Sequence, residues 1–386
     1  MLRVGIITLN GEFNYGNRLQ NFALQKVLQG FGVTADTIVI KTSKFDKLKK
    51  EFCFGGEIKN IRDVNYILKK NASKITLSSF KRRKNYKKMK KLKYETIRLF
   101  TESNIRTIYT TKKELEDLKR DYNLFIVGSD QVWNPNIIEF DTTHFLSFVS
   151  REKRFSYAAS IGVENMPEYP IYLREHYKKN LSNMNYISVR EQSGSVLLEK
   201  MLGKKIDVAP DPTLLLNKEE WCQKLNIVDE GKDSFLLIYF VSEISPEIYK
   251  EIKKIAKEKQ LSIIHVMGDT FGEGRITPNP SKFVELIYRA QYVFTDSFHG
   301  SVFSIIMNTP FFVYKRTDNK GTYTRIESLL SHFKMEQAIV SLGDNIKEKE
   351  DLFNFAISTE ILKKERVRGR KLIFDNILND ECNKDK

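Results

Sequence analysis

One short stretch, residues 291–314, places an ionisable side chain where open α/β sheets bind their ligands. An apolar run typical of a buried strand ends in a polar turn, and an apolar helix and a second strand follow. His299 stands in that turn, where backbone N–H groups at the helix start face the crevice of such a sheet. Histidine exchanges protons near neutral pH, so we predict a catalytic acid or base; the alternative is a core histidine in a tight turn. The neighbouring residues expected to contact a ligand are Asp296, Ser297, Gly300 and Ser301.

A second group of polar residues opens the first helix of the chain. Residues 4–9 are typical of a buried strand, and a loop rich in glycine and amide side chains leads from it into an amphipathic helix. Such a helix start offers N–H groups to a polar or anionic ligand, although the loop does not match the GxGxxG dinucleotide pattern. The alternative is a group that only caps the helix. The residues expected at the ligand are Asn14, Gly16, Asn17, Arg18 and Gln20.

Two more expected strands end in side chains that could do chemistry. Residues 124–127 run into Ser129 and Asp130, and residues 187–189 run into Arg190. Asp130 could accept a proton from a hydroxyl group, so we predict a catalytic role for it beside a ligand contact for Ser129. The planar guanidinium of Arg190 suits an anionic ligand. The structural alternatives are a simple turn for the first pair and an ion pair with a nearby carboxylate for the arginine.

The order of the expected elements indicates the fold class. Strands and helices alternate in both halves of the chain, which predicts an α/β protein with two Rossmann-like domains facing one cleft. We expect an N-terminal domain over residues 1–215, a C-terminal domain over 216–345 and a helical tail over 346–386. A lysine-rich segment, about residues 41–106, reads as two or three amphipathic helices inserted into the first domain.

The composition excludes several classes of protein. With 386 residues, of which 41% are hydrophobic, the chain is long enough for two cores. No apolar run approaches the roughly 20 residues of a membrane helix, and the start does not read as a cleavable leader. Cys53, Cys222 and Cys382 are far apart and lack metal-binding spacing, which favours a reducing cytoplasm. No cluster of His, Asp or Glu suggests a metal, and we expect no cofactor.

Four segments, in order, resemble the polysaccharide pyruvyl transferase family over about residues 3–330. They are residues 14–20 with 23–25, 127–133, 187–191 and 295–300. The resemblance implies a fold like that of the two-domain GT-B glycosyltransferases. It also implies transfer of pyruvate from phosphoenolpyruvate, as co-substrate, onto two hydroxyls of a sugar to give a cyclic ketal. Members commonly serve the synthesis of bacterial capsule, exopolysaccharide or cell-wall glycan, so the implied partner is a glycan acceptor, free or lipid-linked.

One departure from the family concerns the donor. Family members tend to carry an arginine shortly before the histidine-glycine pair, and this chain has Asp296-Ser297-Phe298 there. The cation for phosphoenolpyruvate must then come from elsewhere. The available residues are Arg18, Arg190, Lys315 and Arg325.

Two other functions compete with this interpretation. A glycosyltransferase with a nucleotide-sugar donor would use the same architecture, a phosphorylated donor and a sugar acceptor. A non-enzymatic nucleic-acid-binding protein would account for the basic character of the chain, but no nucleic-acid module is recognisable, so we expect no nucleic acid among the partners.

The positive charge is concentrated in one segment. Residues 41–93 hold 19 Lys and Arg against 4 Asp and Glu, an excess equal to the formal net charge of +15 of the whole chain. Apolar residues lie between these cations, so we predict that the segment docks a cytoplasmic enzyme on an anionic membrane surface at its inner face. The alternatives are a solvated helix face, or lysines that cover the cleft and steer an anionic donor inward.

Overall fold

The computed structural model describes residues 2–10, 14–41, 80–138, 141–163, 169–268, 275–315 and 323–379. Residues 42–79 of the lysine-rich insertion lie outside this part of the chain, so the number of helices there stays a prediction.

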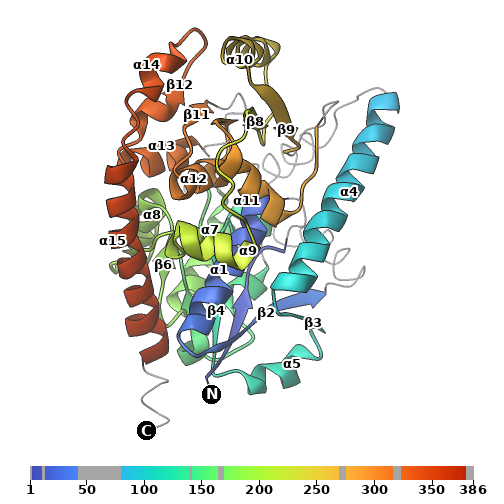
Figure 1. Ribbon diagram of the computed structural model, residues 1–386. Coiled ribbons are helices and arrows are strands. Elements are labelled where there is room, and N and C mark those ends of the chain that lie inside the picture. The colour runs from blue at the N-terminus through green and yellow to red at the C-terminus, as the bar shows by residue number, and fades with distance from the viewer. Residues whose placement is uncertain are drawn as a thin grey trace.

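The N-terminal half folds around a five-stranded parallel sheet in the order β3-β2-β1-β4-β5 (Figure 1). Its strands are β1 (Arg3–Ile7), β2 (Thr34–Lys41), β3 (Thr107–Thr111), β4 (Leu124–Val127) and β5 (Arg154–Ser156). The central strands β1 and β4 are apolar and almost wholly buried, as expected of a parallel sheet covered on both faces. Ile7 pairs with Val127, so both strands end at the same edge, where Ser129 and Asp130 follow.

The C-terminal half repeats this plan in a second parallel sheet, with the order β12-β11-β10-β8-β9. Its strands are β8 (Phe235–Tyr239), β9 (Ser262–Val266), β10 (Tyr292–Thr295), β11 (Phe311–Tyr314) and β12 (Ile339–Val340). Strand β10 lies in the middle, and helix α12 (Phe298–Met307) connects it to β11. The strand, turn, helix and strand expected over 291–314 are therefore confirmed, as is the GT-B-like pair of Rossmann-like units.

The helices cover these sheets and connect their strands. Within the described residues the first are α1 (Tyr15–Gly30), α4 (Phe80–Asn104), α5 (Leu115–Leu118), α6 (Pro135–Ile138), α7 (Ile171–Ser182) and α8 (Gln192–Leu202). The later ones are α9 (Lys218–Leu225), α10 (Pro246–Glu258), α11 (Pro280–Arg289), α13 (Tyr323–His332), α14 (Ile346–Glu350) and α15 (Phe355–Ile373). Short 3₁₀ turns are η2 (Lys119–Asp121), η3 (Thr142–Phe145), η4 (Arg151–Lys153), η5 (Pro212–Leu215) and η6 (Glu336–Ala338), and η7 (Phe374–Leu378) is π-helical.

A small parallel pair of strands links the first sheet to the second half. It consists of β6 (Ser188–Val189) and β7 (Asp207–Val208), and a bridge between Ala159 and Val189 attaches it beyond β5. The chain then passes through η5 before it reaches the second sheet. The boundary expected at residue 216 stays a prediction, since the first strand of the second sheet begins only at Phe235.

Aromatic side chains pack the two halves into one continuous core. Tyr15, at the start of α1, stacks on Phe283 of α11 with ring centres 4.5 Å apart. Trp221 of α9 lies between Phe22 of α1 and Phe303 of α12, at 5.6 and 5.0 Å between ring centres. The start of α1 is therefore held against the C-terminal half, which places its polar residues beside the turn that precedes α12.

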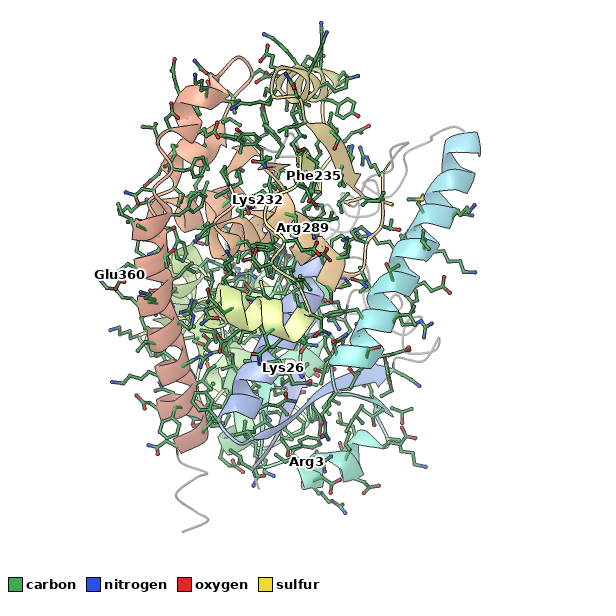
Figure 2. The ribbon with its side chains drawn as sticks, in the orientation of Figure 1. Arg3, Lys26, Lys232, Phe235, Arg289 and Glu360 are labelled. Carbon is green, nitrogen blue, oxygen red and sulfur yellow. The ribbon has the colours of Figure 1, made fainter. Side chains whose placement is uncertain are left out.

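The start of β8 is fixed by charged side chains. Arg289 Nε contacts Asp233 Oδ2 at 2.7 Å, and Lys232 Nζ donates to Thr309 Oγ1 at 2.6 Å. Lys232, Phe235 and Arg289 lie close together at this junction in Figure 2. These contacts help to hold β8 in register beside β10.

The two long helices α4 and α15 run along opposite sides of the molecule (Figure 1). Helix α15 and η7 lie within the tail that was expected to be helical over 346–386, and α15 packs on η5 and on α12. Gly369 allows this close approach, because a Cβ there would lie 2.5 Å from Leu215. No helix of the described residues is both long and apolar enough to cross a bilayer.

Helix α4 confirms a basic helix in the inserted segment but corrects one residue. Lys93 belongs to the segment that was expected to face a membrane, the solvent or the cleft, and it is only 1% exposed. Its Nζ donates to the carbonyl of Gly268 at 2.9 Å and lies 4.8 Å from the centre of the Tyr15 ring. The lysine thus joins the inserted helix to the C-terminal half, a contact that its basic neighbours do not reveal.

We expect Lys93→Met to destabilise the protein, because it leaves the buried Gly268 carbonyl without this donor. The free energy of unfolding should fall by about 1–3 kcal/mol, the usual cost of an unsatisfied buried group. Urea denaturation measures the change. Lys91→Met, on an exposed position of the same helix, is the control and should stay within about 0.5 kcal/mol of the wild type. Equal midpoints for the two variants would contradict the role given to Lys93.

Candidate active site

The turn between β10 and α12 is built to hold His299 in one place. Asp296 accepts hydrogen bonds from the backbone N–H groups of Val241, at 2.6 Å, and Ser242, at 2.9 Å, which ties the turn to the end of β8. Ser297 caps α12 by accepting from the Gly300 N–H at 3.3 Å. These contacts give the turn residues a structural role, and their contact with a ligand stays a prediction.

Small residues on both sides let the turn before α12 pack closely against the start of α1. A Cβ on Gly300 would lie 2.6 Å from Thr295 Oγ1, and a Cβ on Gly16 would lie 2.0 Å from Nδ1 of His299. Ser301 is fully buried and donates to the Ser297 carbonyl at 3.1 Å. The His299 ring therefore lies against the backbone at the start of α1, where a larger residue than Gly16 would displace it.

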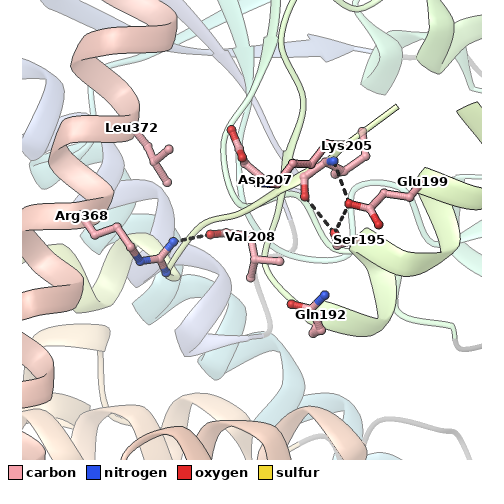
Figure 3. Close-up of a pocket in the computed structure, with 9 residues that line it drawn as sticks. Gln192, Ser195, Glu199, Lys205, Asp207, Val208, Arg368 and Leu372 are labelled. Carbon is pink, nitrogen blue, oxygen red and sulfur yellow. Dashed lines mark hydrogen bonds between the residues drawn. The ribbon is translucent and has the colours of Figure 1, made fainter. Parts of the chain in front are cut away.

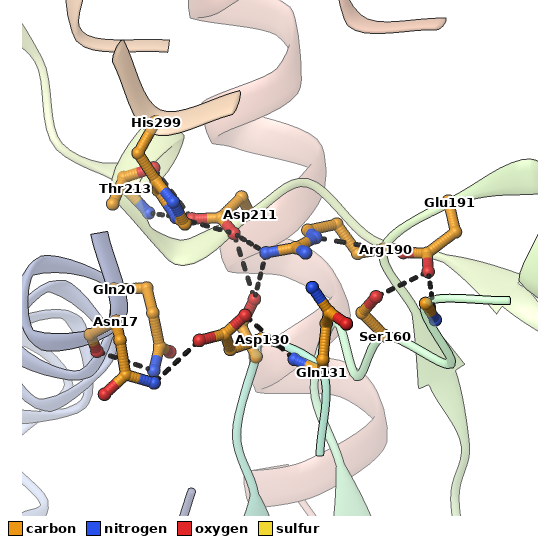
Figure 4. A network of polar contacts seen from close by, with 12 residues as sticks. Asn17, Gln20, Asp130, Gln131, Ser160, Arg190, Glu191, Asp211, Thr213 and His299 are labelled. Atoms are coloured by element: carbon orange, nitrogen blue, oxygen red, sulfur yellow. Dashed lines mark hydrogen bonds and ion pairs between the residues drawn. The ribbon is translucent and has the colours of Figure 1, made fainter. Parts of the chain in front are cut away.

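Asp211 is the centre of the polar network around His299 (Figure 4). Its Oδ2 accepts from Arg190 Nη1 at 2.8 Å and from Ser129 Oγ at 3.0 Å, and it lies 3.7 Å from Nε2 of His299. Its Oδ1 accepts from the N–H and Oγ1 of Thr213, at 3.0 and 2.7 Å. Burial alone would raise the pKa of Asp211, but His299 and Arg190 outweigh it and hold that pKa far below its usual range. This carboxylate is ionised at neutral pH.

Asp130 supplies a second carboxylate to the network. Its Oδ2 accepts from Asn17 Nδ2 at 2.7 Å, and its backbone has a positive φ of 74°, a strained conformation for a non-glycine residue at a strand end. Burial would raise the pKa of Asp130, yet the charges of Arg190 and His299 lower it. The two aspartates therefore surround the histidine and arginine with negative charge.

Arg190 makes an ion pair with a nearby carboxylate, as the structural alternative expected, and it does so with two of them. Besides Asp211, its Nε lies 3.8 Å from Glu191 Oε2, and its guanidinium lies 4.7 Å from the ring centre of Phe298. The side chain is only 4% exposed. Burial would lower its pKa, but Asp211, Glu191 and Asp130 raise it, so Arg190 carries its charge throughout. Its contact with a donor stays a prediction.

The predicted residues at the start of α1 form hydrogen bonds that fix the orientation of one side chain of the network. Asn14 caps the helix by accepting from the Asn17 N–H at 3.3 Å. Arg18 is 2% exposed, and its guanidinium donates to Asn17 Oδ1, Asn10 Oδ1 and the Leu9 carbonyl. Gln20 donates to Thr8 Oγ1 and to the Asn17 carbonyl. These bonds orient the Asn17 amide towards Asp130, and the predicted ligand contacts of Asn14, Arg18 and Gln20 stay untested.

The last two predicted cations lie on the C-terminal half. Lys315 follows β11 directly and is exposed. Arg325 lies on α13 and lines a pocket of about 430 Å³ together with Arg190, Asp211 and Phe298. Of these two residues, only Arg325 is placed beside the polar network. Among the described residues, no three His, Cys, Asp or Glu side chains cluster in a way that could hold a metal ion.

The main residue that sequence reasoning missed is Asp211. It lies four residues before the expected end of the first domain at residue 215, and an aspartate two residues before a threonine is typical of a capped turn. That local signal is correct, since Oδ1 caps η5. The second oxygen, which contacts Ser129 and Arg190, acts on residues distant in the chain and leaves no trace in the local sequence.

The fold and this network define an α/β protein with two Rossmann-like units and a polar network to which both halves of the chain contribute. The family model of polysaccharide pyruvyl transferases matches residues 14–318, which is most of the chain. The chain therefore belongs to the polysaccharide pyruvyl transferase family, and it is a transferase. The search of curated proteins returned no match.

Several solved structures are similar over nearly the whole chain. A UDP-GlcNAc 2-epimerase from Methanocaldococcus jannaschii is 16% identical, with 95% of this chain and 94% of that chain covered and a TM-score of 0.47. MnaA of S. aureus, solved with UDP, is 13% identical, with 97% and 92% covered and a TM-score of 0.46. MurG of Acinetobacter baumannii is 10% identical, with 98% and 100% covered and a TM-score of 0.41. The fold assignment rests on the two parallel sheets and not on these structures.

We expect Asp211→Asn to destabilise the protein strongly, because it leaves the buried charge of Arg190 with less compensation. Breaking a buried ion pair from one side costs about 3–5 kcal/mol. Chemical denaturation measures the loss. The same substitution at Asp117, whose side chain is 83% exposed, should change stability by less than about 0.5 kcal/mol. A loss below about 1 kcal/mol at Asp211 would show that the network does not depend on it.

Proposed function

We propose that this enzyme transfers pyruvate from phosphoenolpyruvate onto two hydroxyls of a sugar, forming a cyclic ketal. The observation that carries the proposal is the position of His299 between Asp130, Asp211 and Arg190, in a chain that belongs to the pyruvyl transferase family. A buried proton-transfer group beside ionised carboxylates and a cation is what the reaction needs. The glycan formed would be a bacterial capsule, exopolysaccharide or cell-wall polymer.

The reaction moves two protons and one phosphate group. A proton added to the methylene carbon of phosphoenolpyruvate makes its C2 electrophilic, and the first sugar hydroxyl adds there and gives up its proton. The C2–O bond to phosphate then breaks, phosphate leaves with the bonding electrons, and the second hydroxyl adds and loses its proton. One proton ends in the new methyl group and the other on inorganic phosphate. An acid and a base are therefore required, and no redox partner is needed.

The residues of the network match these tasks. His299 takes the proton of an attacking hydroxyl and returns it to carbon or phosphate. Asp211, 3.7 Å from Nε2, stabilises the protonated imidazole, and Asp130, ionised beside it, accepts a hydrogen bond or a proton from the sugar. Arg190, Arg325 or Lys315 and the positive end of α12, which begins at Phe298, supply the charge for the carboxylate and phosphate of the donor.

The first test compares donors and the role of His299. Phosphoenolpyruvate at about 100 times its Kd should stabilise the protein by about 2.7 kcal/mol in a thermal-shift experiment, while UDP-sugars should not. His299→Asn should keep the melting temperature within a few degrees and lose at least about 10²-fold in phosphate release with a panel of pyranosides as acceptors. His176→Asn, on α7, is the control and should keep full turnover. Stabilisation by nucleotide-sugars alone would favour the glycosyltransferase alternative.

We also propose that α4 brings the enzyme into peripheral contact with an anionic membrane. Its described cationic side chains that lie exposed are Lys87, Lys88, Lys90 and Lys91. Leu92 and Leu99 are 46% and 53% exposed on the same helix, which supplies apolar groups for the interface. Each basic residue near an anionic leaflet contributes about 1 kcal/mol. Contact with the membrane would suit an acceptor carried on a lipid.

Vesicle co-sedimentation tests this contact. Binding should require anionic lipid and weaken as salt rises, and it should fall when Lys87, Lys88, Lys90 and Lys91 all become glutamine. The matched control replaces four exposed lysines of α10, residues 250, 253, 254 and 257, and makes the same change in net charge. Equal binding by the two variants would mean that net charge and not α4 is responsible, and no binding at low salt would exclude the contact.

A further inference from the structure

The pocket of about 430 Å³ beside the polar network extends away from His299, between α13 and α15. It shares Arg190 and Asp211 with the candidate active site, so a ligand in it lies next to the reacting groups. Its size is within the usual range for small-molecule sites. The mechanism above uses only its inner end and leaves most of its lining without a task.

The charges in this pocket balance each other. Three guanidinium groups and three carboxylates line it, and Arg190 pairs with Asp211 at 2.8 Å. Glu365 pairs with Arg368 and lies 3.3 Å from His332. Burial would raise the pKa of Glu365, but His332 and Arg368 lower it to about 2, so this carboxylate only accepts hydrogen bonds at neutral pH.

The balance of positive and negative charge in this pocket suits a neutral sugar better than the anionic donor. Phosphoenolpyruvate carries a carboxylate and a phosphate and needs an excess of cations, which this pocket as a whole does not supply, although Arg190 and Arg325 of its lining are among the donor contacts proposed above. Sugar hydroxyls both donate and accept, so they can bond carboxylates and guanidinium groups at once. The pocket also has an apolar side for the C–H face of a ring. The residues of that side are Leu214, Phe298, Leu329 and Phe333.

A second pocket of about 320 Å³ continues the first along α15 (Figure 3). The two share Gln192, Val208 and Arg368. Arg368 donates to the Val208 carbonyl and so lies at the boundary between them. Beyond it the second pocket is again lined by both signs of charge, from Glu199 and Lys205. A chain of sugars can therefore continue outward from the network.

We propose that these two pockets bind the acceptor as an oligosaccharide of at least two units, with a neutral sugar in the inner pocket and the next unit in the outer one. That this glycan is the acceptor of the reaction rests on the proposed function, but the binding of a neutral glycan in these pockets does not. Longer glycans should then bind more tightly than single sugars, because only they reach past Arg368.

The test fills the inner pocket from its rim. Ser328 lines it on α13 and is exposed, so Ser328→Trp should block it, while Ser331→Trp, on an exposed position of the same helix outside the lining, is the matched control. The probes are an array of neutral mono- to tetrasaccharides without donor and, separately, the thermal shift with phosphoenolpyruvate. We expect Ser328→Trp to bind the glycans at least about tenfold more weakly, which is 1.4 kcal/mol, and to keep the donor shift. Ser331→Trp should match the wild type in both measurements.

The remaining results either overturn the proposed glycan site or contradict only the proposed function. Unchanged glycan binding by Ser328→Trp, or a wild type that binds none of the arrayed glycans, overturns the proposal. A variant that loses the donor shift but keeps the glycans places the donor in this pocket, which also overturns it. A wild type that phosphoenolpyruvate does not stabilise, but whose glycan binding Ser328→Trp abolishes, contradicts the proposed function and leaves the glycan site standing.

Discussion

The buried ion pair between Arg190 and Asp211 is the constraint on which the centre of this molecule depends. Both side chains are almost completely withdrawn from water, and a charge in such a place is costly unless an opposite charge and hydrogen bonds compensate it. Ser129 from the end of β4 and Thr213 from η5 complete that set around Asp211. The ends of separate segments must therefore meet at one point, and His299 reaches the same point from the second sheet.

Close packing at this point explains the small residues around it. The His299 ring occupies the space that a side chain at Gly16 would need, and Thr295 does the same at Gly300. Helix α1 can approach so closely because Tyr15 is stacked on Phe283 in the other half. The position of His299 thus depends on the apolar contact of Tyr15, which directly precedes Gly16 in the chain. The polar network therefore has little freedom to rearrange.

Helix α4 illustrates how composition can hide two different roles. Its exposed lysines have the character of a surface that attracts anions, and Leu92 lies exposed among them. Lys93 belongs to the same run and is buried, where it joins the carbonyl of Gly268 to the ring of Tyr15. One helix therefore presents charge to the outside and a structural cation to the core, and only burial distinguishes the two.

The sequence by itself determined the two α/β halves, the strand, turn and helix around His299, and the family, because these depend on periodicity and short motifs within continuous segments. It also brought Asp130, Arg190 and His299 to notice, each at the end of an expected strand. Only the tertiary structure decided that Asp211 joins them, that Arg18 orients Asn17 and that Lys93 is buried. Those outcomes depend on which strand ends share an edge and which charges lose their water, and both are set by contacts between residues far apart in the chain.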